Sequence, residues 1–203
     1  AYSVPNHKRV TDQAIDLINH CEVGLTITMS QRKALKKYNV GQDKLLKKAV
    51  LWHFPQPLPE SDNPAPHKSR ASGYGKVVVD TTFERWVNYL DIQAHQQAEP
   101  DERVQAIGGI LHFLQDMAVP SHAVPIFHPS KIANADLFDS WDGFAEDSNL
   151  IKQMPCIQLD AGKVMDVGSF IGDARRETLN SLKQVHTDSC GENQLCTWEL
   201  FWP

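Results

Sequence analysis

A helix that has to end inside a candidate metal-ligand motif is the feature that most constrains this chain. The stretch from Gly108 to His122 contains the pattern His-x3-Asp-x5-His, formed by His112, Asp116 and His122. Residues four apart lie on one face of an α-helix, so His112 and Asp116 offer an imidazole and a carboxylate to one point. Pro120 cannot continue the helix, so the chain turns there and brings His122 back towards the same end. Two nitrogens and one oxygen at this spacing suit a zinc-like divalent ion.

The pair His112 and Asp116 alone has a second interpretation. A buried histidine that is satisfied by a carboxylate would show the same spacing without any metal. The third candidate ligand, His122, and the helix-stopping Pro120 favour the metal site over that alternative.

Most of the remaining chain shows helical periodicity, with apolar residues recurring at spacings of three and four. The apolar stripes are formed by Val10, Ala14, Leu17 and Ile18, by Leu45, Leu46, Ala49 and Val50, by Phe83, Trp86, Val87 and Leu90, and by Val104, Ile107, Leu111 and Leu114. Residues 169–185 form a last helical candidate, while the β-branched segment 76–79 is open to a short strand as well as to a helix. With 203 residues, the chain is long enough for one core. We predict an all-α, bundle-like fold with one domain over residues 1–203.

Segment 54–72 differs from the rest, because five prolines among Ser, Asn and Asp residues predict an irregular surface loop. Because this loop follows His53 directly, we consider two roles for it: the rim of a site, or a flexible excursion without a role.

The four cysteines indicate an oxidising compartment. Cys190 and Cys196 enclose a short stretch rich in turn-forming residues, which suits a disulfide and leaves Cys21 to pair with Cys156. The alternative, a cysteine-ligated metal, lacks the usual Cys-x2-Cys spacing. We therefore expect a secreted or periplasmic protein. No run of 18 apolar residues is present, so we expect no membrane-spanning segment.

The motif resembles that of the zinc-dependent phospholipase C and P1-type nuclease superfamily. In that family the Asp of a His-x3-Asp helix is separated by five residues from a further histidine, with a proline two positions before that histidine, and His112, Asp116, Pro120 and His122 match all four positions. The segment that begins at His7 and runs into Ala-Ile-Asp at residues 14–16 resembles the family's first helix. A His-Phe pair at residues 53–54 is similar to the one that follows the family's second ligand segment. The likeness covers about residues 1–147 and implies a helical bundle of the phospholipase C and P1 nuclease type.

The resemblance also implies a centre of two to three zinc ions. For the first ion, His53, His112 and the bridging Asp116 match the family, and Asp43 is the acidic residue that would supply the remaining carboxylate. The second ion in the family binds the first helical histidine, here His7, the bridging aspartate, and the amine and carbonyl of the N-terminal residue.

That N-terminal ligand would be Ala1, although Tyr2 has the spacing of the nuclease branch and could be the true terminus. For the third ion the sequence departs from the family. His122 is expected to bind it together with Asp139, but Ala135 stands where the family has a histidine four residues earlier. Asp142 and His128 remain alternatives for completing this site.

By this resemblance the chain is expected to be a zinc-dependent phospholipase C, a hydrolase that cleaves the headgroup phosphodiester of a phospholipid. Asp43 is the predicted catalytic base, which accepts a proton from the attacking water. The Ala after His122 favours the phospholipase branch. We expect a monomer that meets its phospholipid substrate at a membrane surface. The alternatives are a P1-type single-strand nuclease, which the net charge of −5 does not favour, and a zinc-binding homologue with a weakened third metal site.

Overall fold

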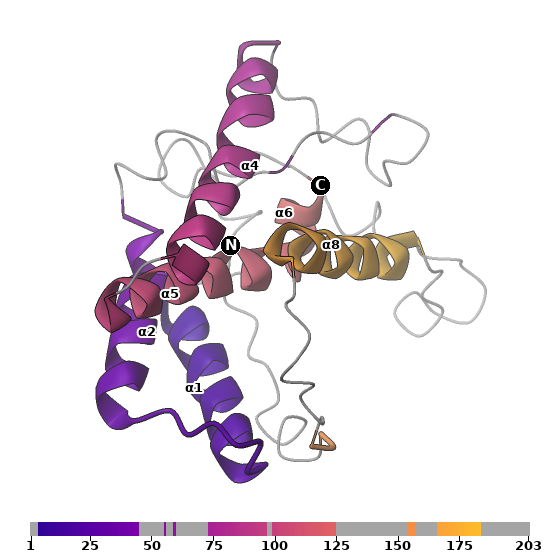
Figure 1. The fold of residues 1–203 in the computed structure, drawn as a ribbon. Helices are drawn as coiled ribbons and strands as arrows, with labels where there is room; N and C mark the ends of the chain where they lie inside the picture. Colours follow the sequence, from indigo (N-terminus) through magenta and orange to yellow (C-terminus); the bar gives the residue numbers. More distant parts are fainter. Residues whose placement is uncertain are drawn as a thin grey trace, which may run out of the picture.

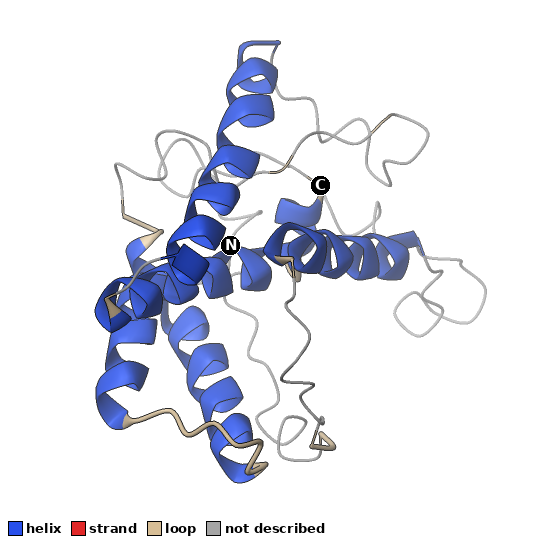
Figure 2. Cartoon of the chain, in the orientation of Figure 1, coloured by secondary structure: helices blue, strands red, loops and turns tan. Residues whose placement is uncertain are grey.

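The computed structural model describes residues 4–44, 55, 59, 73–96, 99–124, 154–156 and 166–183. Within these ranges the chain forms helices joined by loops and turns, without a strand (Figure 2), which confirms the predicted all-α fold. The helices are α1 (Val4–His20), α2 (Met29–Gly41), α4 (Gly73–Gln96), α5 (Pro100–Met117), α6 (Pro120–Ala123) and α8 (Val167–Lys183). The β-branched segment 76–79 lies inside α4, so the helical alternative is the correct one there.

Helix α5 lies at the centre of this arrangement and contacts each of the other five helices (Figure 1). Its beginning is encoded locally, because Pro100 opens the helix and Asp101 and Glu102 place negative charge in its first turn. It ends at Met117, and Pro120 then opens the four-residue helix α6. The predicted stop and turn between Asp116 and His122 are therefore confirmed.

On one side, α5 packs against α4 and α8 through an apolar core. The buried residues of this core are Phe83, Val87 and Leu90 of α4, Ala106, Phe113 and Met117 of α5, and Ile171 of α8. The rings of Phe83 and Phe113 meet edge to face with centroids 5.6 Å apart, an arrangement that aromatic pairs prefer. Burial of this apolar surface is the main source of stability on this side.

On the other side, α5 packs against α1 and α2 through buried polar residues. Asn6, His7, Thr11 and Ile15 are the buried residues of α1, and Leu35 and Asn39 are those of α2. From α5, this side receives His112, Gln115 and Asp116, all of them buried. The fold thus places the central motif at a polar interface between three helices.

Two of the predicted apolar stripes do not match the buried faces. The stripe on α4 is correct, since Phe83, Val87 and Leu90 are buried. The stripe on α5 is wrong, because Ile107 is 41% exposed and its other members are only half-buried. The stripe on α1 is likewise only half-buried, and the buried positions lie beside it. Periodicity of apolar residues misses a helix face whose interior positions are glycine, histidine, glutamine and aspartate.

Helices α1 and α2 are also joined outside the polar interface. Thr28 caps α2, because its hydroxyl accepts a hydrogen bond from the amide of Gln31, whose side chain accepts one from the amide of Thr28. Asp12 of α1 binds both Arg32, at 2.6 Å, and Lys36, at 2.7 Å. Burial alone would raise the pKa of the Asp12 carboxyl, but the hydrogen bonds from Lys36 and Arg32 hold it below its ordinary value.

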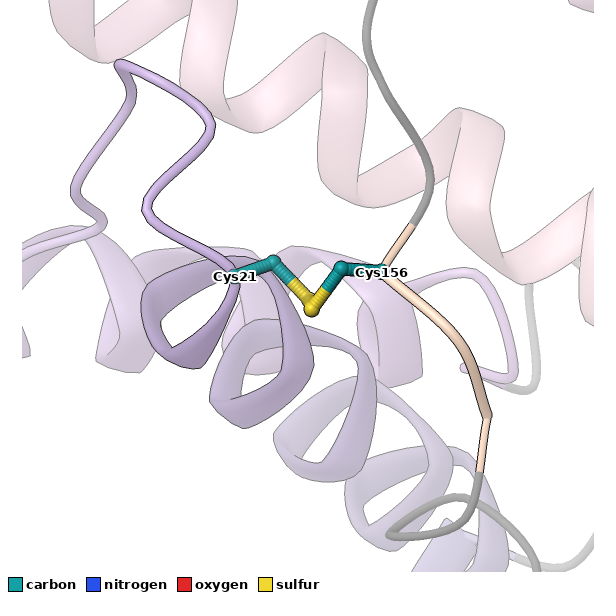
Figure 3. The surroundings of a disulfide bond; sticks show 2 residues. All are labelled: Cys21 and Cys156. Carbon is teal, nitrogen blue, oxygen red and sulfur yellow. A yellow bond between two sulfur atoms is a disulfide. The ribbon is translucent and has the colours of Figure 1, made fainter.

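A disulfide joins Cys21, directly after α1, to Cys156, as predicted (Figure 3). The two Cα atoms are 5.3 Å apart and 135 positions apart in sequence, so the bond ties the end of α1 to a distant part of the chain. The predicted partner pair, Cys190 and Cys196, lies outside the described residues and stays a prediction. Among the described helices, none has both the length and the apolar character needed to cross a membrane.

Candidate metal centre

Five of the predicted ligands come together in the polar interface, and we call them the ligand cluster. Its members are His7 of α1, Asp43 just after α2, His112 and Asp116 of α5, and His122 of α6. All five are removed from solvent, with side-chain exposures of 0% for His7, His112 and Asp116, 3% for His122 and 4% for Asp43. Residues of α1, of the turn after α2, of α5 and of α6 therefore contribute to one buried site, and His7 and Asp43 are distant in sequence from the other three ligands.

Asp116 lies between the three histidines. Its Oδ1 is 3.4 Å from Nε2 of His7. Its Oδ2 is 3.3 Å from Nε2 of His112 and 3.5 Å from Nδ1 of His122. Because the two oxygens face different imidazoles, the carboxylate has the geometry of a bridge between two positions within the cluster.

Asp43 faces the same imidazoles from the other side. Its Oδ2 is 3.7 Å from Nε2 of His7, and its Oδ1 is 3.9 Å from Nε2 of His112. These two histidine rings stack with their centroids 4.2 Å apart and an angle of 26° between their planes. The stacking directs both Nε2 atoms to the same region.

The donor set fits a divalent ion. One ligand atom each from His7, Asp43 and His112 lies within 4.8 Å of the others, so these residues could hold a metal. Two ligands that share a tetrahedral zinc are about 3.3 Å apart, because each lies about 2.0 to 2.1 Å from the ion. The observed spacings of 3.3 to 3.9 Å around Asp116 and Asp43 are close to that value and longer than ordinary hydrogen bonds.

Electrostatics also favour a cation here. Two buried carboxylates cost free energy unless positive charge compensates them. Burial lowers the pKa of His7, but its interactions with Asp116, then Gln115 and Asp43, outweigh that effect and raise the pKa above its ordinary value. The surroundings that attract a proton to this imidazole would equally attract a metal ion, which competes with the proton for the same nitrogen.

Gly108 allows α2 to approach α5 closely enough to bring Asp43 to the cluster. A Cβ atom at this position would lie 2.9 Å from the carbonyl oxygen of Leu35 and 2.9 Å from Cβ of Tyr38. Gly108 is one helical turn before His112, so the close contact lies on the same face as the ligands. The absence of a side chain at this position therefore sets the distance between the two helices at the site.

A buried hydrogen-bond network supports the cluster, and the sequence analysis missed it. Nδ1 of His7 is 2.7 Å from Oε1 of Gln115, and that oxygen also accepts a hydrogen bond of 3.1 Å from the amide of Asn39. The amides of Gln115 and Asn39 both donate to the hydroxyl of Thr11. The sequence feature that could have predicted this network is a polar residue one helical turn from a candidate ligand, because Thr11 lies four residues after His7.

Helix α8 holds the turn that carries His122. The hydroxyl of Thr178 donates a 2.7 Å hydrogen bond to the carbonyl oxygen of Met117, at the end of α5. Nε of Arg175 donates a 2.9 Å hydrogen bond to the carbonyl oxygen of Ala123, next to His122. Burial lowers the pKa of Arg175 to about 10, although the charge of Glu84 opposes this. These bonds fix the α5–α6 corner from the side opposite to α1.

Three predicted ligands, Ala1, His53 and Asp139, lie outside the described residues, as do the alternatives Asp142 and His128. The five that are described are brought together. The resemblance divided His7 and the pair of Asp43 and His112 between two ions, whereas in the structure one ligand atom from each of the three lies within 4.8 Å of the others, and both histidines also face Asp116. Segment 54–72 lies outside the described residues except for Pro55 and Pro59.

Comparisons of this chain with protein-family models, with curated proteins and with solved structures find no match. The resemblance to the phospholipase C and P1 nuclease superfamily therefore rests on the motifs in the sequence.

Proposed function

We propose that this protein is a zinc-dependent phosphodiesterase of the phospholipase C type. The observation that carries the proposal is the buried ligand cluster, in which Asp116 lies within 3.5 Å of nitrogen atoms of His7, His112 and His122. Imidazole nitrogens combined with carboxylate oxygens are the ligands of catalytic zinc sites. The motif likeness around this cluster supports phosphodiester cleavage as the reaction.

In this proposal His7, His112, His122, Asp43 and Asp116 hold the metal. Zinc supplies Lewis acidity when bound, which stabilises negative charge on phosphate oxygens and makes water acidic enough to ionise near neutral pH. The chain's residues orient that centre and exclude bulk water from it, because their side chains are almost completely buried.

Asp43 is the proposed general base. Its carboxylate faces both His7 and His112, and its side chain is 4% exposed. A carboxylate in this position can accept the proton that the attacking water loses. Asp116, with an exposure of 0%, is enclosed by the three histidines and is better suited to binding metal than to exchanging protons with solvent.

The proposed substrate is a phospholipid at a membrane surface, and the proposed protein is a secreted or periplasmic monomer. The substrate follows from the likeness of the motif, including the Ala that follows His122, to the phospholipase branch. The compartment is supported by the disulfide between Cys21 and Cys156, since such bonds persist mainly in oxidising compartments.

The test is a pair of assays on purified protein with and without added zinc, one with dispersed short-chain phosphatidylcholine and one with single-stranded DNA and RNA. We expect release of diacylglycerol and phosphorylated headgroup, dependent on zinc. The Asp43→Asn variant should lose most of this activity, by a factor of about 10² to 10⁴, as expected for removal of a general base. Asp101→Asn is the matched control, because Asp101 is an exposed carboxylate at the start of α5.

The other outcomes contradict the proposal in different ways. Cleavage of nucleic acid without cleavage of lipid would replace the phospholipase by a nuclease. Bound zinc with neither activity would indicate a zinc-binding homologue that is not an enzyme. Elemental analysis that finds less zinc than half an equivalent per chain would remove the basis of the proposal.

A further inference from the structure

Three polar residues, Thr11, Asn39 and Gln115, support the ligand cluster through a hydrogen-bond network. The donor and the acceptor of each bond in this network can be assigned in only one way. The hydroxyl of Thr11 is 2.8 Å from the carbonyl oxygen of His7, the residue four positions before it. A carbonyl oxygen only accepts hydrogen bonds, so the single proton of the Thr11 hydroxyl is donated to it. The hydroxyl oxygen is then left as an acceptor for its other two neighbours.

These neighbours are the side-chain amides of Gln115, at 3.0 Å, and Asn39, at 3.2 Å. Each must present its NH2 group to Thr11, because the only hydroxyl proton is already used. The orientation of the Gln115 amide is thereby fixed, with its oxygen directed away from Thr11.

The oxygen of Gln115 faces His7. Oε1 accepts a hydrogen bond from Asn39 and lies 2.7 Å from Nδ1 of His7. An amide oxygen cannot donate, so this contact is a hydrogen bond only when Nδ1 carries a proton, and a neutral His7 ring that keeps the bond is the Nδ1–H tautomer. The other ring nitrogen, Nε2, is then the one with a lone pair, and it is the nitrogen that faces Asp43 and Asp116.

We propose that Gln115, oriented by Thr11 and Asn39, is a positioning residue that locks His7 in the tautomer able to bind metal through Nε2. Partners of this kind fix the ring orientation of a ligating histidine, and their loss typically weakens metal affinity by about 10- to 100-fold. The part of this inference that concerns metal affinity rests on the proposed zinc site, whereas the tautomer itself does not.

The first experiment uses the unaltered, metal-free protein. Two-bond ¹H–¹⁵N correlation spectra at alkaline pH, where imidazoles are neutral, distinguish the two tautomers of each histidine. The signals of His7 are identified by their loss in a His7→Gln variant. We expect the proton on Nδ1 of His7. A proton on Nε2 would overturn the proposal even if the protein binds zinc and cleaves lipid.

The second experiment measures zinc affinity by competition with a chromophoric chelator. Gln115→Met removes both hydrogen bonds of the side chain at similar size, and we expect affinity to fall about 10- to 100-fold. Thr11→Val keeps the shape but removes the hydroxyl that orients Gln115, so we expect a smaller loss in the same direction. Thr11→Ser keeps the hydroxyl and is the matched control, with affinity unchanged.

The two experiments separate the inference from the proposed function. Gln115→Met should also change the tautomer signals of His7, which a loss of packing alone would not do. Unchanged signals and unchanged zinc affinity in Gln115→Met would overturn the inference and leave the enzyme proposal intact. An Nδ1 proton in a protein that cleaves no phosphodiester would support the inference and overturn the proposed function.

Discussion

The two sides of α5 are packed through different kinds of residue, apolar on one side and polar on the other. Towards α4 and α8 the helix buries Phe113, Met117 and Ala106 in an apolar core. Towards α1 and α2 it buries His112, Gln115 and Asp116. The apolar side gains free energy from almost any close packing, because the hydrophobic effect has no direction. The polar side has to satisfy each donor, acceptor and charge with a partner in the correct geometry.

This difference separates the part of the molecule that is stabilised by apolar packing from the part that contains the candidate metal ligands. The apolar side contains none of the five ligands, and its packing of α4 and α8 on α5 requires no metal charge to compensate buried carboxylates. The polar side is arranged around groups that cost free energy to bury, and a bound cation would compensate two carboxylates, Asp43 and Asp116, at once. The stability of variants with substitutions on the polar side should therefore depend on zinc differently from that of variants with substitutions on the apolar side.

The largest effect is expected on the apolar side, from Phe83→Ala. Phe83 is 5% exposed and meets Phe113 edge to face, so its truncation leaves a cavity in the core. The free energy of unfolding should fall by about 3 to 5 kcal/mol. Denaturant titrations with and without zinc should give a similar loss, because Phe83 is not a ligand and packs against Phe113, the residue whose ring contacts His112. A loss that occurs only with zinc present would show that the two sides are not independent.

An intermediate effect is expected on the polar side, from Asp116→Asn. At free zinc about 100-fold above the Kd, binding adds about 2.7 kcal/mol to the stability of the unaltered protein. The variant should lose that increment, because the carboxylate that faces all three histidines has gone. The measurement is the rise in melting temperature on adding zinc, with Asp101→Asn as the control. Equal rises in both variants would contradict a metal site centred on Asp116.

The smallest effect compares two neighbouring glycines of α5. In Gly108→Ala the new Cβ would lie 2.9 Å from the backbone oxygen of Leu35. In Gly109→Ala it would lie 2.9 Å from Cδ1 of Leu90, the end of a side chain that can move. Crowding at Gly108 should lower the free energy of unfolding by about 1 to 3 kcal/mol. The higher helix propensity of alanine should offset about 1 kcal/mol of this loss.

Gly109→Ala is the matched control and should be close to neutral or stabilising. Zinc affinity should fall in Gly108→Ala alone, because moving α2 away from α5 also moves Asp43. If Gly109→Ala proves the more damaging variant in both measurements, the close approach of α2 does not set the geometry of the site.

Local sequence predicted segments of α1, α4, α5 and α8, because helical signals lie within a few residues, but no apolar stripe was predicted in α2, and the stripe at residues 45–50 lies outside the described residues. Pro100 and Pro120 mark the beginnings of α5 and α6, and the Thr28 capping box marks that of α2. The segment 76–79 shows where such signals conflict, since three valines favour a strand but lie within a helix. The helical conformation there runs against the local β propensity of these residues.

The buried faces were less predictable, because the interior of this protein is not uniformly apolar. Ile107 belongs to the apolar stripe of α5 and is nevertheless 41% exposed, whereas Gly108 next to it is buried. A pattern of apolar residues identifies a face that packs against another apolar face. It carries no information on a face that packs against polar partners from α1 and α2.

The sequence by itself determined that His112, Asp116 and His122 would converge, because helical spacing and a proline-induced turn act over ten residues. His7 and Asp43 were expected at this centre from the family resemblance and not from spacing, and it is the tertiary structure that brings them to the motif and places Gln115 and Thr11 next to His7. Those contacts span up to 109 positions along the chain, between His7 and Asp116, so they exist only once α1 and α2 have packed on α5. Spacing in sequence fixes what one helix presents, whereas the direction of a hydrogen-bond network depends on which groups the fold brings into contact.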